Sequence, residues 1–152
     1  MKPFYASPEA VLRLQFHAGE WLGTPFMPNA AVKGAGVSCQ QLVGAIYRET
    51  HFLPPTFVIP EGPMNWGHAH TESLIAAFLA AQPNFLPVPA PSLQPGDLLG
   101  FRLGGCIHHC GLVVSHEGKF IHCLRGQGTL LSSVRDASYR SRLGQVWRPI
   151  IL

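Results

Sequence analysis

Cys39 stands where a thiol can act as a nucleophile. Ser38 before it is a helix-capping residue, and apolar side chains recur at helical spacing from Leu42 to Tyr47. Cys39 therefore lies in the first turn of a helix predicted over 37–50. The unpaired N–H groups and the positive dipole end of such a turn lower a thiol pKa. The same N–H groups can hold the oxyanion that forms when a thiolate attacks a carbonyl.

Two histidines in the C-terminal half could complete an acyl-transfer site with Cys39. His109 opens the predicted strand HCGLVVS, and His122 lies near the end of the next strand, KFIHCL. A two-residue turn at Glu117 and Gly118 would bring both imidazoles to the same end and the same face of a hairpin. His109 then has the place of the general base, and His122 that of the group orienting it. A buried structural cysteine and ordinary core or surface histidines are the alternative interpretation.

Five short motifs, in this order along the chain, resemble the NlpC/P60 family of papain-like cysteine peptidases: GTPF, SCQQLV, QPGDLLGF, HCGLVV and FIHC. The resemblance extends from about Pro8 to Leu152. It implies that Cys39 is the nucleophile, His109 the general base and His122 the third residue of the site. The implied activity is that of a cysteine peptidase or amidase, which cleaves the stem peptide of cell wall peptidoglycan through a thioester.

The chain departs from the family pattern at two positions near the nucleophile. Phe26 stands where the family usually has a tyrosine, and Ser38 where it usually has an aspartate. In the family those two groups commonly help to hold the free amino end of the murein peptide, so their loss leaves the specificity for that peptide open. Gln40 can supply another polar contact to the substrate. Trp66 and His68 in the segment NWGHAH are candidates for the wall of the substrate groove.

The same resemblance leaves other roles open. The small peptidases of phage tails and gene transfer agents are similar in character, which implies tail or particle proteins as partners. The N-terminal segment MKPFYASPEA contains no secretion signal, so we expect synthesis in the cytoplasm and action in a particle or in the periplasm after delivery. A weakened scaffold that serves as a tail assembly or interaction protein is one alternative. An amidase or acyltransferase acting on another substrate is a second.

A zinc site is the alternative interpretation of the remaining cysteines, Cys106, Cys110 and Cys123, because thiolate and imidazole are the ligands that zinc prefers. Alternation along a strand turns Cys110 and Cys123 to the face opposite to their histidine neighbours, so their spacing is poor for such a site. Without a secretion signal, free thiols are favoured over disulfides. We therefore expect no metal and no cofactor.

Charged residues are scarce in the chain: Lys, Arg, Asp and Glu make up 12% of it, and apolar residues 47%. The eight carboxylates are scattered, which excludes a local acid pair and an acidic metal loop. The formal net charge of +3 is spread without a basic run, so we expect no nucleic acid partner. No segment approaches the roughly 18 apolar residues of a membrane span. Because none of the carboxylates neighbours Cys39 or the two histidines, the sequence predicts a Cys-His-His site without an acidic member.

Helices and strands must hold these residues in place. A first helix is predicted from Pro8 to Leu22, with the helix over 37–50 after it. Residues 51–95 form an irregular insert that contains an apolar helix, ESLIAAFLAA, and can wall the cleft. Five short strands fill the rest of the chain. This order predicts an α+β fold of the papain-like kind, with N-terminal helices packed on a small, mostly antiparallel C-terminal sheet, and a single catalytic domain over 1–152.

Overall fold

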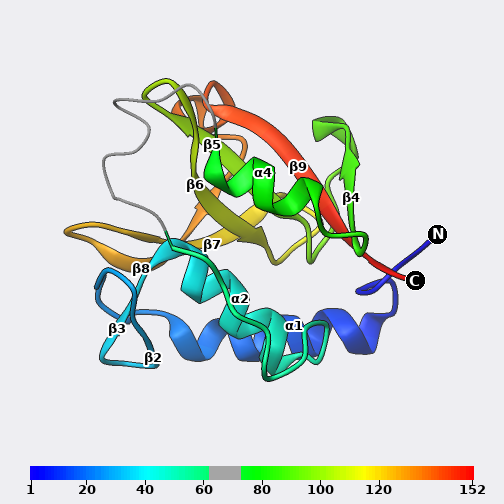
Figure 1. Cartoon of the computed structure of the whole chain (residues 1–152), viewed down its shortest axis with the longest axis horizontal. Coiled ribbons are helices and arrows are strands. Elements are labelled where there is room, and N and C mark those ends of the chain that lie inside the picture. The colour runs from blue at the N-terminus through cyan, green and yellow to red at the C-terminus, as the bar shows by residue number, and fades with distance from the viewer. Residues whose placement is uncertain (62–72) are drawn as a thin grey trace.

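The structure, a computed structural model, describes residues 1–61 and 73–152 (Figure 1). The helices are α1 (Pro8–Trp21), α2 (Cys39–Glu49), α4 (Leu74–Ala80) and α5 (Ala137–Arg140), with one 3₁₀ turn, η1 (Ala90–Ser92). The strands are β1 (Lys2–Pro3), β2 (Ala31–Val32), β3 (Gly36–Val37), β4 (Phe85–Val88), β5 (Leu98–Leu103), β6 (Cys106–Val113), β7 (Lys119–Leu124), β8 (Gly128–Ser133) and β9 (Leu143–Ile151). No helix in the described part of the chain is long and apolar enough to cross a membrane.

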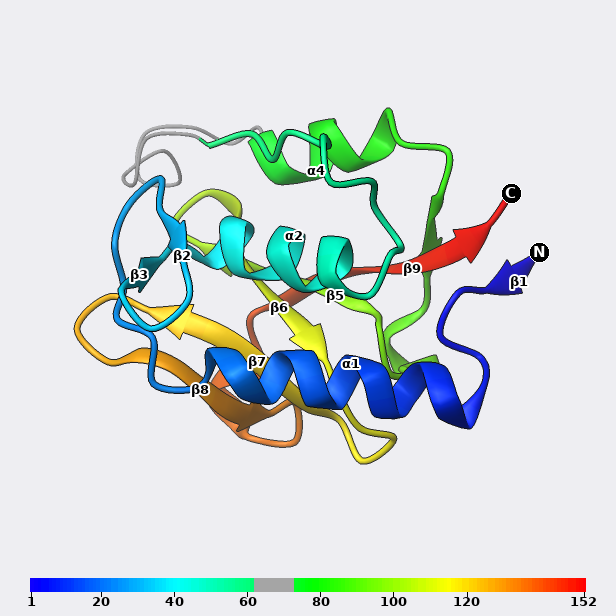
Figure 2. The same cartoon turned by 90° about the horizontal axis from the view of Figure 1, so that it is seen from below.

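Seven of the strands form one antiparallel sheet, which confirms the predicted α+β class. The order of the sheet is β1-β9-β5-β6-β7-β8, and β4 also pairs with β9. The five predicted strands became β5 to β9. The helix α2 packs against β6 and β7, with α1 on one side of it and α4 on the other (Figure 2). The predicted arrangement of N-terminal helices on a C-terminal sheet is therefore confirmed.

Serine caps fix where the helices begin. In α1, α2 and α4 the hydroxyl of the serine before the first helical residue accepts a hydrogen bond from an N–H in the first turn. This bond gives a partner to one of the N–H groups that have no acceptor within the helix. The pairs are Ser7 with Ala10 (3.1 Å), Ser38 with Gln41 (3.4 Å) and Ser73 with Ala76 (3.0 Å). The first two helices match their predicted ranges closely. The third is shorter than the segment ESLIAAFLAA and begins at Leu74.

Alternation along the strands separates two apolar cores. Leu112 and Ile121 pair across β6 and β7 and pack in the larger core, together with buried residues of α2 such as Leu42. Their neighbours Val113 and Phe120 belong to a second core on the opposite face of the sheet. The helix α2 is thereby fixed on one face of these two strands, with its first residue at their end.

The hairpin of β6 and β7 differs from the predicted one. The Val114 N–H donates to the Lys119 carbonyl (2.8 Å), which closes a loop over 115–118. The predicted two-residue turn at Glu117 and Gly118 is therefore wrong. The loop shifts the register by two residues, and a shift of two leaves every side chain on its predicted face. The strands β6 and β7 pair at two positions, Leu112 with Ile121 and Val113 with Phe120. Beyond these pairs, toward His109 and His122, the two strands do not pair with each other.

A buried ion pair ties β9 to the start of β5. Asp97, from the motif QPGDLLGF, is fully buried and accepts two hydrogen bonds from the Arg148 guanidinium, at 2.9 Å from Nε and 2.8 Å from Nη2. The Gln94 N–H donates to the same carboxylate at 2.9 Å. This aspartate is therefore a structural residue, remote from the predicted chemistry.

Candidate active site

A groove of about 430 Å³ opens at the N-terminal end of α2, where β6 and β7 are not paired. Its walls include the predicted residues Phe26, Ser38, Cys39, Gln40 and His109. They also include Glu61, His108 and Arg125, which the sequence analysis did not single out. His122 is fully buried behind His109. Trp66 and His68 lie outside the described residues.

A chain of hydrogen bonds runs inward from His109. Its Nε2 lies 2.9 Å from Nδ1 of His122, and Nε2 of His122 lies 2.7 Å from the hydroxyl of Ser132 on β8. The structure thus brings the two predicted histidines together. It adds Ser132, which the sequence analysis missed. Because Nε2 of His109 is engaged with His122, its Nδ1 is the ring nitrogen left for Cys39.

Burial keeps His122 neutral. Desolvation, and then the charge of nearby His109, lower the pKa of His122 from 6.5 to about 3. A neutral imidazole has one N–H. If His109 carries a proton on Nε2, it donates to Nδ1 of His122, and the single His122 proton lies on Nε2 toward Ser132. The pair can therefore orient an imidazolium at His109 without a carboxylate.

The Cys39 thiol is placed for activation. The residue is 9% exposed, and Sγ lies 3.1 Å from the Gln40 side-chain oxygen, to which the thiol form donates. A hydrogen bond from the Cys110 thiol, and then the hydrogen bond and charge of His109, hold the pKa of Cys39 well below its usual range, against the effect of burial. The same contact with Cys39, together with burial, raises the pKa of Cys110. These two shifts favour a thiolate at Cys39 and a thiol at Cys110.

The first turn of α2 offers donors to an oxyanion. Within a helix the first N–H groups have no acceptor, and the Ser38 cap serves only that of Gln41. The N–H groups of Cys39 and Gln40 at the helix start can therefore face a carbonyl oxygen bound over Cys39. A thiolate, an adjacent imidazole and first-turn donors are the groups that acyl transfer requires.

Solved structures share this arrangement of elements. An NLP/P60 family protein similar to a lipoprotein, from Staphylococcus aureus, superposes with a TM-score of 0.68 at 15% identity, over 100% of this chain and 45% of that one. The NlpC/p60 domain of the peptidoglycan hydrolase SagA gives 0.58 at 15% identity, over 93% and 98%. The peptidoglycan hydrolase RipB from Mycobacterium tuberculosis gives 0.57 at 20% identity, over 99% and 69%. The chain has the NlpC/P60 fold.

The chain shares the fold of these solved structures but little of their sequence. No protein-family model matches the chain, and no curated protein matches it. The chain spans less than half of the Staphylococcus aureus protein but nearly the whole of the SagA domain. The predicted NlpC/P60 fold is confirmed, while the roles of individual residues depend on the site itself.

Glu61 brings a carboxylate to this site, so the predicted absence of an acid beside the nucleophile is wrong. The Ser38 hydroxyl donates to Oε1 of Glu61. The segment before it is held on α2 by two further bonds, from Gln41 Nε2 to the Ile59 carbonyl (3.2 Å) and from Arg48 to the Phe57 carbonyl (3.1 Å). The sequence analysis missed Glu61 because 22 positions separate it from Cys39.

The environment of Glu61 raises the pKa of its carboxyl group. Burial is the main cause that raises the pKa of Glu61, the charge of Cys39 adds to it, and the hydrogen bond from Ser38 opposes both. A cationic group of a ligand would reverse this effect, because an opposite charge nearby stabilises a carboxylate. Glu61 is therefore suited to meet an amine.

The zinc alternative for Cys106, Cys110 and Cys123 gains no support. Among the residues that the structure describes, one group of three or more possible ligands converges, with ligand atoms within 4.8 Å of one another: His17, Glu20 and Glu49. Lys33 already lies in that group, with Nζ 3.1 Å and 2.8 Å from the two glutamates. The cluster is an ion-pair network and holds none of the three cysteines.

Proposed function

We propose that the protein is a cysteine hydrolase that cleaves peptide or amide bonds of cell wall peptidoglycan through a thioester. The observation that carries the proposal is the relay from Cys39 through His109 and His122 to Ser132. The fold adds to it, because SagA and RipB, which share it, are peptidoglycan hydrolases.

The geometry supports a two-step reaction. The Cys39 thiolate attacks the scissile carbonyl carbon, and the N–H groups of the first turn of α2 hold the oxyanion. When the C–N bond breaks, the His109 imidazolium gives its proton to the leaving amine, and a thioester remains on Cys39. His109 then takes a proton from water, the hydroxide attacks the thioester, the C–S bond breaks, and the carboxylic acid product gives its proton to the solvent and leaves as a carboxylate. The thiolate and the imidazolium are thereby restored.

Glu61 is the residue that we propose holds the amino end of the substrate. It lies beside Ser38, on the wall of the groove that contains Cys39. A free amine of the stem peptide would pair with this carboxylate, which takes over the role that the resemblance gives to an aspartate at position 38. Arg125, which is exposed on the same groove, is suited to a substrate carboxylate. A site of action reached with a phage tail or a similar particle is part of this proposal, and it rests on the resemblance of motifs alone.

Digestion of purified peptidoglycan tests the activity. We expect wild-type protein to release peptide fragments with new amino and carboxyl ends, identified by mass spectrometry, and Cys39→Ala to release none. Cys106→Ala, which removes a different buried thiol, is the matched control and should keep the activity. Full activity of Cys39→Ala would refute the thioester mechanism. A wild-type protein that cuts no bond and has no rapidly alkylated thiol would favour the interaction-protein alternative.

A further inference from the structure

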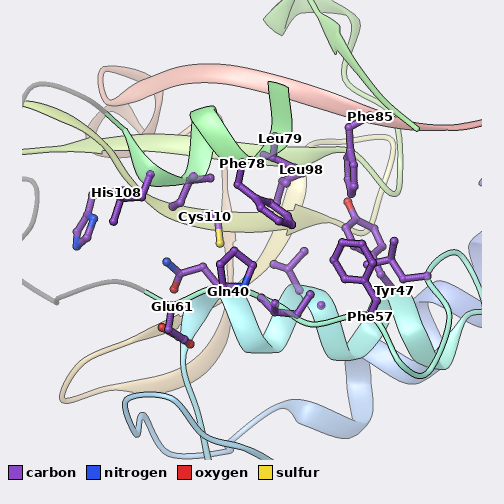
Figure 3. Close-up of a pocket in the computed structure, with 17 residues that line it drawn as sticks. Gln40, Tyr47, Phe57, Glu61, Phe78, Leu79, Phe85, Leu98, His108 and Cys110 are labelled. Carbon is purple, nitrogen blue, oxygen red and sulfur yellow. The ribbon is translucent and has the colours of Figure 1, made fainter. Parts of the chain in front are cut away.

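A second cavity lies beside the groove, between α2 and α4 (Figure 3). It has a volume of about 200 Å³. Its walls are mostly apolar: α2 contributes Val43 and Tyr47, α4 contributes Ile75 and Leu79, and the sheet contributes Leu98. We call it the α2–α4 cavity. The reaction proposed above makes no use of it.

The α2–α4 cavity has a polar end and an aromatic end. In Figure 3, Gln40, Glu61 and His108 gather at one end, and Tyr47 and Phe85 lie at the other. The first three residues line both the cavity and the groove that holds Cys39. The two spaces therefore meet at these side chains, close to the nucleophile.

The outer wall of the cavity is held in place by α2. Ile59 lies so close to Gly44 that a Cβ on this glycine would come within 2.3 Å of the Ile59 side chain. The bonds from Gln41 and Arg48 fix the backbone at Ile59 itself and at Phe57, two residues before it. The missing side chain at Gly44 thus lets the segment over 57–61 close over the cavity without filling it.

We propose that the α2–α4 cavity is a specificity pocket that receives an apolar group of the substrate while the scissile carbonyl lies at Cys39. The inference rests on the proposed function of the groove and adds the class of substrate. Beyond the polar end, a charged group would lose its hydration between apolar walls without gaining a partner, whereas an apolar group gains free energy from leaving water.

The volume limits the size of this group. A dry apolar cavity of about 150 Å³ accepts benzene. A cavity of about 200 Å³ accordingly suits a group of roughly six to eight carbons. Two sources share this chemistry: a medium-length acyl chain and a bulky apolar amino acid side chain.

Alkylation of Cys39 by reagents of increasing chain length tests the pocket without a known substrate. The full-length protein is treated with N-ethyl, N-butyl, N-hexyl, N-octyl and N-dodecyl iodoacetamide, and the rate at Cys39 is followed by peptide mapping. We expect the rate to rise about fourfold for each added methylene up to about six to eight carbons and then to level off. A rate that does not depend on chain length overturns the proposal.

Two tryptophan variants of α4 locate the effect. Leu74 lines the cavity and is 38% exposed, so Leu74→Trp should partly fill the cavity and bring the ratio of octyl to ethyl rates close to one. Ala77 is exposed on the same helix and does not line the cavity, so Ala77→Trp should keep the wild-type ratio. Equal ratios in the two variants would mean that the chain binds elsewhere, and the proposal would fall.

The two proposals fail in different ways. Slow alkylation of Cys39 by every reagent, including N-ethyl iodoacetamide, contradicts the proposed function. Rapid alkylation without chain-length dependence contradicts only the specificity pocket. Fluorogenic amides then separate the sources: faster cleavage of octanoyl than of acetyl amides identifies an acyl chain, and faster cleavage of leucyl or phenylalanyl than of alanyl peptide amides identifies a side chain. Equal cleavage of the small and the large members of both pairs overturns the pocket.

Discussion

The lowered pKa of Cys39 depends on a second cysteine as well as on the histidine. The Cys110 thiol lowers this pKa as a hydrogen-bond donor, and His109 lowers it by its hydrogen bond and charge. We expect Cys110→Ala to move the midpoint of the pH profile of iodoacetamide alkylation at Cys39 to higher pH, and to slow alkylation at pH 7 several-fold, because a thiolate loses a donor.

Cys106→Ala is the matched control for this prediction. Cys106 is buried on the same strand, β6, but does not contribute to the pKa of Cys39. Its removal should leave the midpoint in place. The same midpoint for Cys110→Ala and the wild type would show that the thiol contact does not stabilise the thiolate.

His122 makes the folded protein sensitive to acid. Its pKa is about 3 in the folded state against 6.5 in an exposed histidine, so the unfolded chain binds the proton more readily. The stability that the neutral side chain contributes is present above pH 6.5 and is lost as the pH falls toward 3. We expect this residue to cost about 1.4 kcal/mol of unfolding free energy for each pH unit below 6.5.

Urea unfolding at several pH values measures this loss. His122→Gln, which cannot take up the proton, should show a flatter dependence between pH 6.5 and pH 3. His116→Gln, in the exposed hairpin loop, is the control and should keep the wild-type slope. A wild-type slope in His122→Gln would contradict a neutral buried histidine.

The sequence predicts the residues of the site that lie in recognisable motifs. It does not predict the contacts that depend on how the strands pair. Cys39, His109 and His122 follow from a capped helix and two strand ends, and the structure places them together. Ser132 reaches His122 from a neighbouring strand, and its place depends on the pairing of β7 with β8, which no motif specifies. Glu61 reaches the groove through backbone bonds to α2 that have no signature in the sequence.

At the scale of elements, α2 serves both the nucleophile and the wall of the neighbouring cavity. At Gly44 the segment over 57–61 lies so close to this helix that a Cβ would clash with Ile59. We expect Gly44→Ala to push Ile59 outward and to lower the free energy of unfolding by about 1–3 kcal/mol, the usual cost of overpacking. The displaced segment also carries Glu61, so kcat/KM on peptidoglycan fragments should fall.

Chemical denaturation of a double-mutant cycle checks this contact. Ile59→Ala removes the clashing side chain, so Gly44→Ala should cost less in that background than in the wild type. Gly19→Ala on α1 is the control, since a Cβ there meets nothing within 4 Å, and it should stabilise the helix by about 0.5–1 kcal/mol. Additive effects at Gly44 and Ile59 would contradict the contact.

Helices and strands with a regular hydrophobic period could be predicted from the sequence, and elements too short or too proline-rich to show one could not. The helices α1 and α2 and the five C-terminal strands are long enough to show a period and carry caps or turn residues at their ends. The strands β1, β2 and β3 have two residues each, too few for any period, and β4 lies in a proline-rich segment that is typical of a connector. Pairing with β9 or with each other, rather than local sequence, makes them strands.

At the scale of the whole molecule, the site requires two layers to stay in register. The helix layer carries Cys39 and the sheet carries His109, so a movement of α2 relative to β6 separates nucleophile and base. The buried apolar contacts between the two layers, such as those of Leu42 with the larger core, maintain this relation. The sheet itself depends on β9, which pairs with β1, β4 and β5.

Asp97 and Arg148 therefore affect the stability of the whole fold without touching the site. Arg148→Met leaves a fully buried carboxylate without its cation, and we expect it to lower the free energy of unfolding by about 3–5 kcal/mol. The double variant Asp97→Asn with Arg148→Met removes the unpaired charge and should recover part of this loss. Below the unfolding temperature, alkylation of Cys39 should proceed at the wild-type rate in both variants. A changed rate in a fully folded variant would show that the β9 edge and the groove are coupled, whereas a loss below 1 kcal/mol would contradict the structural role of the ion pair.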